Sequence, residues 1–163
     1  MSMIGNYRRV TMQELAALRV NPASVIAFLY PADNAPFPAG RHLDIDKAWH
    51  AIHFLLNGDA WDGDRPLMDA VLGGTALGEE DVGYGPARYL EPDEVREVAQ
   101  ALDDLPEFEL LERFDAAALN DADIYTPPWS DADREYVGDN YSAMAEFFRK
   151  AAEAGDAMLL YLN

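Results

Sequence analysis

The fold is decided by residues 130–162, which read SDADREYVGDNYSAMAEFFRKAAEAGDAMLLYL. The first residue is a serine, a preferred N-cap, and the apolar residues after it recur at intervals of three and four, which predicts an amphipathic helix over residues 131–154. Gly138 is a point at which this helix could divide, and Gly155 is a typical residue to end it. Residues 158–162 are apolar without interruption, which favours a strand buried inside a sheet. The chain is therefore expected to end in a long helix followed by an interior strand.

The rest of the chain predicts more helix than strand. Thr11 and Glu14 have the spacing of a capping box, so a helix is expected over residues 12–19. Proline at a first helical position predicts another helix over residues 92–104. Shorter helices are expected at residues 23–29, at residues 66–72 and after Pro106, and strands at residues 3–7 and 88–90. Residues 73–86 are rich in glycine and are expected to be irregular.

Length and composition indicate one domain over residues 1–163. Half of the 163 residues are apolar, which is enough to form one sizeable core. Together with the elements above, this predicts a single-domain fold of the α/β class, as a helix-rich α+β mix. The chain has no cysteine, which excludes a disulfide scaffold, a thiolate metal site and a cysteine nucleophile.

The charge balance bears on partners and location. The chain has 12 Lys and Arg against 30 Asp and Glu, a net charge of -18. Such a chain repels nucleic acids and anionic membranes, so neither is expected as a partner. No apolar run approaches the roughly 20 residues of a membrane-spanning helix, and no signal-peptide pattern is visible, so we expect a cytoplasmic protein. The acidic residues are spread along the chain, which fits a well-solvated surface, and the more specific interpretation is a basic protein partner.

All three histidines of the chain lie in residues 41–54, which read RHLDIDKAWHAIHF. They are His42, His50 and His53. Asp44 is expected to cap a helix that runs to Asn57 and is ended by Gly58. At 100° per residue, one stripe of this helix carries aspartate and histidine, and the opposite stripe carries tryptophan and aliphatic residues. We therefore expect a polar, histidine-bearing face toward solvent.

Three side chains on that stripe, Asp46, His50 and His53, could carry chemistry. Their types suit zinc or another divalent ion, and Asp46 could instead orient a histidine for acid–base catalysis. Neither pattern is specific. An ordinary Asp–His pair on a solvated helix face, with Trp49 in the core, also explains the spacing. We favour that interpretation and predict no metal.

Two loops with aromatic residues are further candidates. The motif GYGPARY combines two glycines with Tyr84 and Arg88, which could bind a carboxylate or a phosphate. Its alternative is a turn whose arginine pairs with a nearby carboxylate. The motif IYTPPW presents Tyr125 and Trp129, and such a pair more often covers a core than binds a ligand. The sequence contains no P-loop, dinucleotide fingerprint or nucleophile elbow, so no cofactor is expected.

Four motifs follow one another along the chain: LDIDKAW at residues 43–49, LLNG at 55–58, AVLGG at 70–74 and YGPARYL at 84–90. As an ordered set they resemble the YfbM-like family of small uncharacterised bacterial proteins, over essentially the whole chain. The resemblance implies a compact domain in which helices flank a small mixed sheet as a three-layer sandwich, and it implies no established activity. It also places five candidate residues in the family pattern: Asp44, Asp46, Lys47, Trp49 and His53. His50 lies outside that pattern, which weakens the metal interpretation by one ligand.

Two functions from different classes remain open. The first, which we favour, is a non-catalytic protein that binds a basic protein partner, for example to neutralise it as an immunity-type protein does. The second is a small-molecule-binding protein or an enzyme. Its cleft would be formed by Asp46, Lys47, His53, Tyr84 and Arg88, which requires the loop at Tyr84 to fold over the start of the Asp46 helix.

Overall fold

The computed structural model describes residues 2–163, which form a single α+β domain built on one sheet. The five strands are β1 (Gly5–Val10), β2 (His42–Asp44), β3 (Thr75–Asp81), β4 (Pro86–Leu90) and β5 (Ala157–Leu162). Their order across the sheet is β2-β1-β5-β4-β3. Every neighbouring pair is antiparallel, which differs from the mixed sheet that the resemblance implies. β1 runs opposite to β2 and β5, and β4 runs opposite to β5 and β3, so no parallel pair is formed.

The apolar segment at the end of the chain forms the central strand, as its sequence predicts. β5 pairs with β1 over six residues and with β4 over three. Its side chains alternate between the two faces of the sheet. Met158 and Leu160 belong to the larger of two hydrophobic cores, and Leu159 and Tyr161 belong to the smaller one. The strand is therefore buried on both sides.

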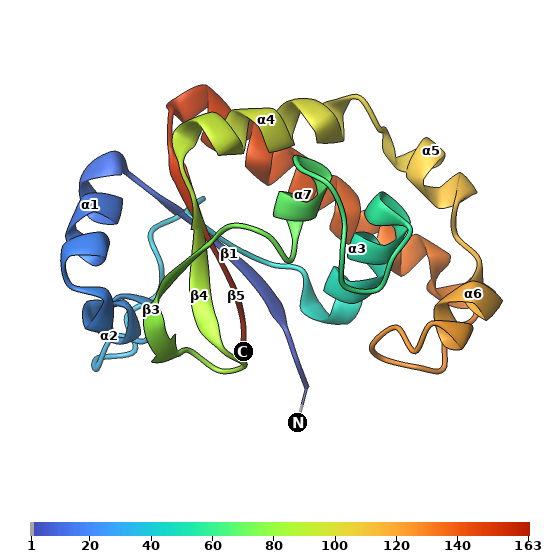
Figure 1. The fold of residues 1–163 in the computed structure, drawn as a ribbon, viewed down its shortest axis with the longest axis horizontal. Helices are drawn as coiled ribbons and strands as arrows, with labels where there is room; N and C mark the ends of the chain where they lie inside the picture. Colours follow the sequence, from blue (N-terminus) through green and yellow to red (C-terminus); the bar gives the residue numbers. More distant parts are fainter. Residues whose placement is uncertain (1) are drawn as a thin grey trace.

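Helices cover both faces of the sheet and produce three layers (Figure 1). On one side lie α1 (Met12–Val20) and α2 (Val25–Leu29); on the other lie α3 (Trp49–Asn57), α4 (Pro92–Asp103) and α7 (Arg134–Ala154). The short helices α5 (Glu107–Glu112) and α6 (Ala116–Asp121) lie at the end of the molecule away from α1 and α2. Four 3₁₀ helices complete the set: η1 (Pro22–Ser24), η2 (Asp46–Ala48), η3 (Leu67–Ala70) and η4 (Asp131–Asp133). Within residues 2–163, no helix is both long and apolar enough to cross a membrane.

The helices predicted over residues 12–19 and 131–154 are confirmed, and the expected division at Gly138 is corrected. The capping box of α1 is present, because Thr11 Oγ1 accepts from the Glu14 N–H at 3.1 Å and the Glu14 carboxylate accepts from the Thr11 N–H at 2.9 Å. The long helix α7 passes through Gly138 without dividing. A Cβ at position 138 would lie 2.5 Å from Glu107 Oε1 and 2.8 Å from Leu111 Cδ1. Glycine at this position therefore allows α5 to pack closely against α7, and it does not break the helix.

Strand β3 corrects the expectation that residues 73–86 are irregular. It pairs with β4, from Thr75 opposite Tyr89 to Asp81 opposite Pro86, with a shift of register between Ala76 and Asp81. Its sequence, TALGEED, is poor in β-branched and aromatic residues, so the strand depends on its partner and not on local preference. The helix expected at residues 66–72 is reduced to the single 3₁₀ turn η3.

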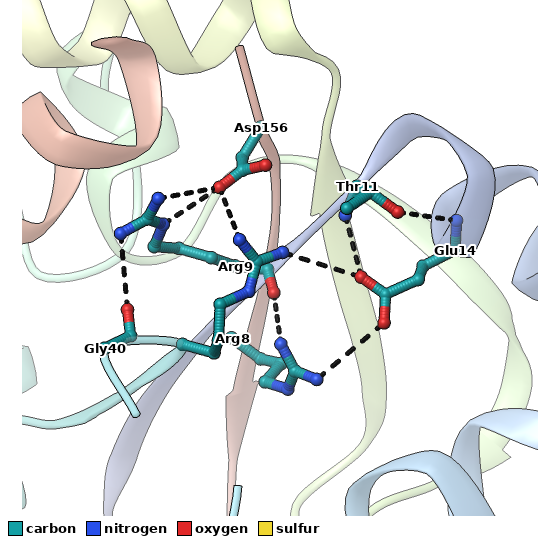
Figure 2. Close-up of polar contacts among 7 residues, drawn as sticks. Arg8, Arg9, Thr11, Glu14, Gly40 and Asp156 are labelled. Atoms are coloured by element: carbon teal, nitrogen blue, oxygen red, sulfur yellow. Dashed lines mark hydrogen bonds and ion pairs between the residues drawn. The ribbon is translucent and has the colours of Figure 1, made fainter. Parts of the chain in front are cut away.

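An ionic cluster fastens β1 to the start of β5 (Figure 2). Asp156 Oδ2 accepts from Arg9 Nε at 3.0 Å and from Arg41 Nη1 at 2.8 Å. The carboxylate of Glu14 lies farther from its cationic neighbours, at 3.9 Å from Arg8 and 3.5 Å from Arg41. Three guanidinium groups therefore share two carboxylates at the junction of β1, α1 and the loop before β2.

Candidate functional site

The histidine-bearing stripe does not face solvent, so that prediction was wrong. The helix is present, with η2 as its first turn and α3 as its body, but His50 is 1% exposed and His53 is fully buried. The reason is the loop after α3, which folds back over the face that was expected to be wet. In this loop, Ala60 O contacts His50 Nε2 at 2.8 Å, and the ring of Trp61 lies 4.4 Å from the His50 ring.

His50 connects two loops that are far apart in the sequence. Its Nε2 donates to Ala60 O, and its Nδ1 accepts from the backbone N–H of Tyr125 at 2.9 Å. These two bonds require the neutral ring with its proton on Nε2. Burial lowers the pKa of His50, which keeps this form. The ring also stacks on Trp49, with centroids 4.7 Å apart. His50 therefore stabilises the position of the loop at residues 125–129.

His53 and Asp46 do not combine with His50 into a metal site. His53 Nδ1 lies 3.3 Å from the side-chain amide of Asn57, and its Nε2 has no hydrogen-bond partner. Burial lowers the pKa of His53 as well. Across residues 2–163, no three His, Asp or Glu side chains are placed to hold one ion. His42, the third histidine, is half-buried on β2 and its Nε2 lies 2.9 Å from Asn6 Oδ1.

The cleft predicted from Asp46, Lys47, His53, Tyr84 and Arg88 requires Arg88 and Tyr84 to lie beside the other three, and the structure shows other contacts for both. The Arg88 side chain points to the turn before β3, where its Nη1 donates to Val71 O at 2.9 Å and to Gly73 O at 2.7 Å. Tyr84 lies in the hairpin between β3 and β4, and its backbone N–H donates to Leu162 O at 3.0 Å. The hairpin is thus held against the end of β5 by a backbone hydrogen bond.

What the structure does bring together is a cavity of about 470 Å³, which we call the Asp46 pocket. It is lined by Asp46, Lys47, Thr126, Pro128, Trp129, Asp133 and Tyr136. These residues come from η2, from the loop before η4, from the end of η4 and from the start of α7. Asp46, Lys47 and Trp129 are candidates from the sequence. Asp133 and Tyr136 were missed, because both read as ordinary residues of the first turns of a long helix.

Hydrogen bonds from Asp44 and from Tyr136 fix the part of the Asp46 pocket that Asp46 and Lys47 form. Asp44 Oδ1 accepts from the backbone N–H of Asp46 at 2.6 Å, in a turn where Asp46 has a φ of 50°. The Tyr136 hydroxyl donates to Asp46 Oδ2 at 2.7 Å and accepts from the backbone N–H of Lys47 at 3.0 Å. Burial and the adjoining Asp46 carboxylate raise the pKa of Tyr136, so the hydroxyl keeps its proton for that bond. Asp44 is therefore a positioning residue for the pocket.

Trp129, which forms the aromatic wall of the pocket, is also fixed by hydrogen bonds. The backbone N–H of Trp129 donates to Asn120 Oδ1 at 2.7 Å, and its indole N–H donates to Ile124 O at 2.8 Å. Tyr125 turns away from the pocket, stacks on Trp49 at 5.8 Å and accepts from the Met3 N–H at 3.0 Å through its hydroxyl. Tyr125 and Trp49 therefore support the wall from behind and do not line the cavity.

Lys47 is the cation of the Asp46 pocket. Its side chain is half-buried, and in the part of the chain that the structure describes its ammonium group has no carboxylate within 4.0 Å. The pocket thus combines two carboxylates, one unpaired ammonium group and an aromatic wall. Such a set can bind and orient a small polar molecule.

The fold and this pocket define a class: a small three-layer α+β domain with a preformed polar pocket beside its longest helix. The chain belongs to the family described as domain of unknown function DUF1877, whose model matches residues 1–161. The YfbM-like resemblance of its motifs is thereby confirmed. Among solved structures, it is similar to YfbM from Escherichia coli, a protein of unknown function, with 24% identity over 98% of this chain and 99% of that chain and a TM-score of 0.74. That likeness shows the fold. A comparison with curated proteins finds no match.

Proposed function

We propose that the protein is a non-catalytic binding module that docks a basic protein partner on one end of the molecule. We call this end the acidic end and define it as residues 103–139, from the end of α4 through α5 and α6 to the start of α7. It holds 12 of the 30 carboxylates and only two arginines. It therefore carries more than half of the net charge of -18.

The observation that carries the proposal is that these 12 carboxylates are unneutralised. Ten of them are exposed, and across residues 2–163 none of the 12 takes part in an ion pair. The two arginines of the segment are used elsewhere: Arg113 donates to Leu55 O at 2.9 Å and Arg134 to Leu111 O at 3.0 Å. The acidic end is thus a region of strong negative potential that a cationic surface would satisfy.

An exposed aromatic residue gives this end an apolar contact point. Phe108 on α5 is 65% exposed, and Glu107 and Glu109 flank it in the sequence. It borders a cavity of about 470 Å³ together with Pro106, Glu107, Leu111 and Arg134. Interfaces draw most of their affinity from a few apolar or aromatic anchors, and charge around them mainly sets association rate and specificity. The partner that fits is a protein with Lys or Arg around an exposed apolar side chain.

The proposed role is to occupy and so neutralise that basic partner, in the cytoplasm. Electrostatic steering would make association fast and sensitive to salt, because charges beyond about 10 Å are screened at 0.1 M ionic strength.

The test uses the full-length protein as bait in a lysate of the organism that encodes it, at low and at high salt. The matched baits are Glu109→Lys/Glu112→Lys in the acidic end and Glu79→Lys/Glu80→Lys on β3, which change the net charge equally. A specific partner is retained by the wild type and by the β3 variant, is lost from the acidic-end variant and is released by salt. The purified partner should then bind the acidic-end variant at least tenfold more weakly.

Two results would contradict the proposal. One is that no captured protein depends on the acidic end. The other is that both charge-reversed baits lose the partner to the same degree, which would mean attraction to net charge alone.

A further inference from the structure

We propose that the Asp46 pocket is a binding site for a small zwitterion that carries a free ammonium group and a free carboxylate, as free amino acids do. The pocket adjoins the acidic end, because its lining residues Thr126, Pro128, Trp129, Asp133 and Tyr136 lie within residues 103–139, whereas Asp46 and Lys47 lie outside that segment. Binding of a small ligand here does not require partner binding on the acidic end. Three observations support this site: the cavity, the charged groups in it that have no ion pair within residues 2–163, and the hydrogen bonds that hold its walls.

The ammonium group of such a ligand is recognised by the two pocket carboxylates. Tyr136 donates to Oδ2 of Asp46, and the backbone and hydroxyl of Ser130 donate to Oδ2 of Asp133 at 2.8 and 3.3 Å. Among residues 2–163, no hydrogen-bond donor is found for the other oxygen, Oδ1, of either side chain. An ammonium group has three donors and satisfies such acceptors through charge-assisted hydrogen bonds.

The carboxylate of the ligand is recognised by Lys47. The chain has two lysines, Lys47 and Lys150. Lys150 pairs with Glu146 at 2.9 Å on the exposed face of α7, whereas Lys47 is half-buried in the pocket without an ion pair. A half-buried ammonium group without a counter-ion loses hydration and gains nothing in return. A ligand carboxylate supplies the missing partner.

The pocket is prepared for such a ligand before it arrives. Asp46 is oriented by Tyr136, and Trp129 is fixed by Asn120 and by Ile124 O. A site whose side chains are already immobilised loses little conformational entropy on binding. The cavity of about 470 Å³ lies within the range of small-molecule sites, and Pro128 and Trp129 offer an apolar wall to the rest of the ligand.

The test is a titration observed at the two lysines. Reductive methylation with ¹³C-formaldehyde gives dimethylammonium signals from Lys47, from Lys150 and from the α-amino group of the chain. Lys47→Met and Lys150→Met assign the two lysine signals, and that of Lys150 is an internal control. The twenty free L-amino acids are added singly. At least one should shift the Lys47 signal with saturation while the Lys150 signal stays in place.

Analogues and variants then test the two contacts. For the amino acid that binds best, its N-acetyl derivative lacks the ammonium group and its amide lacks the carboxylate. Each analogue should bind about tenfold more weakly or worse. By calorimetry on unmethylated protein, Lys47→Met and Asp46→Asn should weaken binding to the same extent, and Lys150→Met should leave it unchanged. Circular dichroism and thermal unfolding confirm that the variants are folded.

Three results would overturn the inference: no free amino acid shifts the Lys47 signal, the analogues bind as well as the parent amino acid, or Lys150→Met weakens binding as much as Lys47→Met does. None of these results bears on the acidic end, which is tested with protein partners.

Discussion

We expect the stability of the junction between β1 and β5 to depend on one residue, Asp156. Its side chain is 7% exposed and is the close counter-ion of both Arg9 and Arg41. Removing one member of a buried ionic group leaves the remaining charges desolvated and unpaired. We expect Asp156→Asn, which keeps the shape and removes the charge, to lower the free energy of unfolding by about 3 kcal/mol. Equilibrium unfolding in urea measures this change.

The matched control is Glu146→Gln. Glu146 pairs with Lys150 at 2.9 Å, but both side chains are more than half exposed. Exposed ion pairs contribute little to stability because water and salt screen them. This substitution should leave the unfolding curve unchanged. Equal losses in the two variants would show that Asp156 is not a buried anchor.

At the scale of elements, the hairpin between β3 and β4 is fixed by a close approach of backbones. A Cβ on Gly83 would lie 2.6 Å from Asn163 Cα and 2.7 Å from Leu162 O, at the end of β5. Gly85, in the same turn, has a φ of 95° but nothing within 4 Å. Gly85→Ala therefore carries only conformational strain, on the order of 1–2 kcal/mol. Gly83→Ala carries strain and a clash with backbone that cannot move aside.

We expect Gly83→Ala to destabilise the protein clearly more than Gly85→Ala does. Thermal unfolding of both variants measures the difference. A further check is amide hydrogen exchange, which should become faster in β3 and β4 of the Gly83 variant while β1 stays protected. If the two variants melted together, the contact between the hairpin and the end of β5 would contribute nothing to stability.

Elements differ in how far the sequence reveals them. The periodic apolar residues predict the long helix α7, and Gly155 predicts where it ends. The uninterrupted apolar run after Gly155 predicts the buried strand β5. The sequence of strand β3 shows no strand pattern, because its residues have low β-propensity and its pairing with β4 stabilises it. Part of the candidate site was also within reach: Asp46, Lys47 and Trp129 line one pocket. The burial of His50 depends on a loop folding back over α3, and no pattern within the helix encodes that tertiary contact.

At the scale of the whole molecule, the three histidines make stability depend on pH. Burial lowers the pKa of His42, His50 and His53. Their ordinary value, about 6.5, applies to the unfolded chain, which therefore binds more protons than the folded protein below that pH. The stabilising contribution is complete above pH 6.5 and is lost as the pH falls below it. For the fully buried His50 and His53, the slope is at most about 1.4 kcal/mol per pH unit each.

The net charge of -18 acts in the opposite direction, because protonation of carboxylates relieves repulsion among them. The ordinary pKa of a carboxyl group is near 4, however, so between pH 6.5 and 5.5 the histidines should dominate. We expect the free energy of unfolding, measured in urea, to fall over this interval, and His53→Leu to reduce the slope. A rise in stability between pH 6.5 and 5.5 would mean that repulsion among the carboxylates outweighs the histidines, and an unchanged slope in His53→Leu would mean that His53 is not kept neutral by its burial.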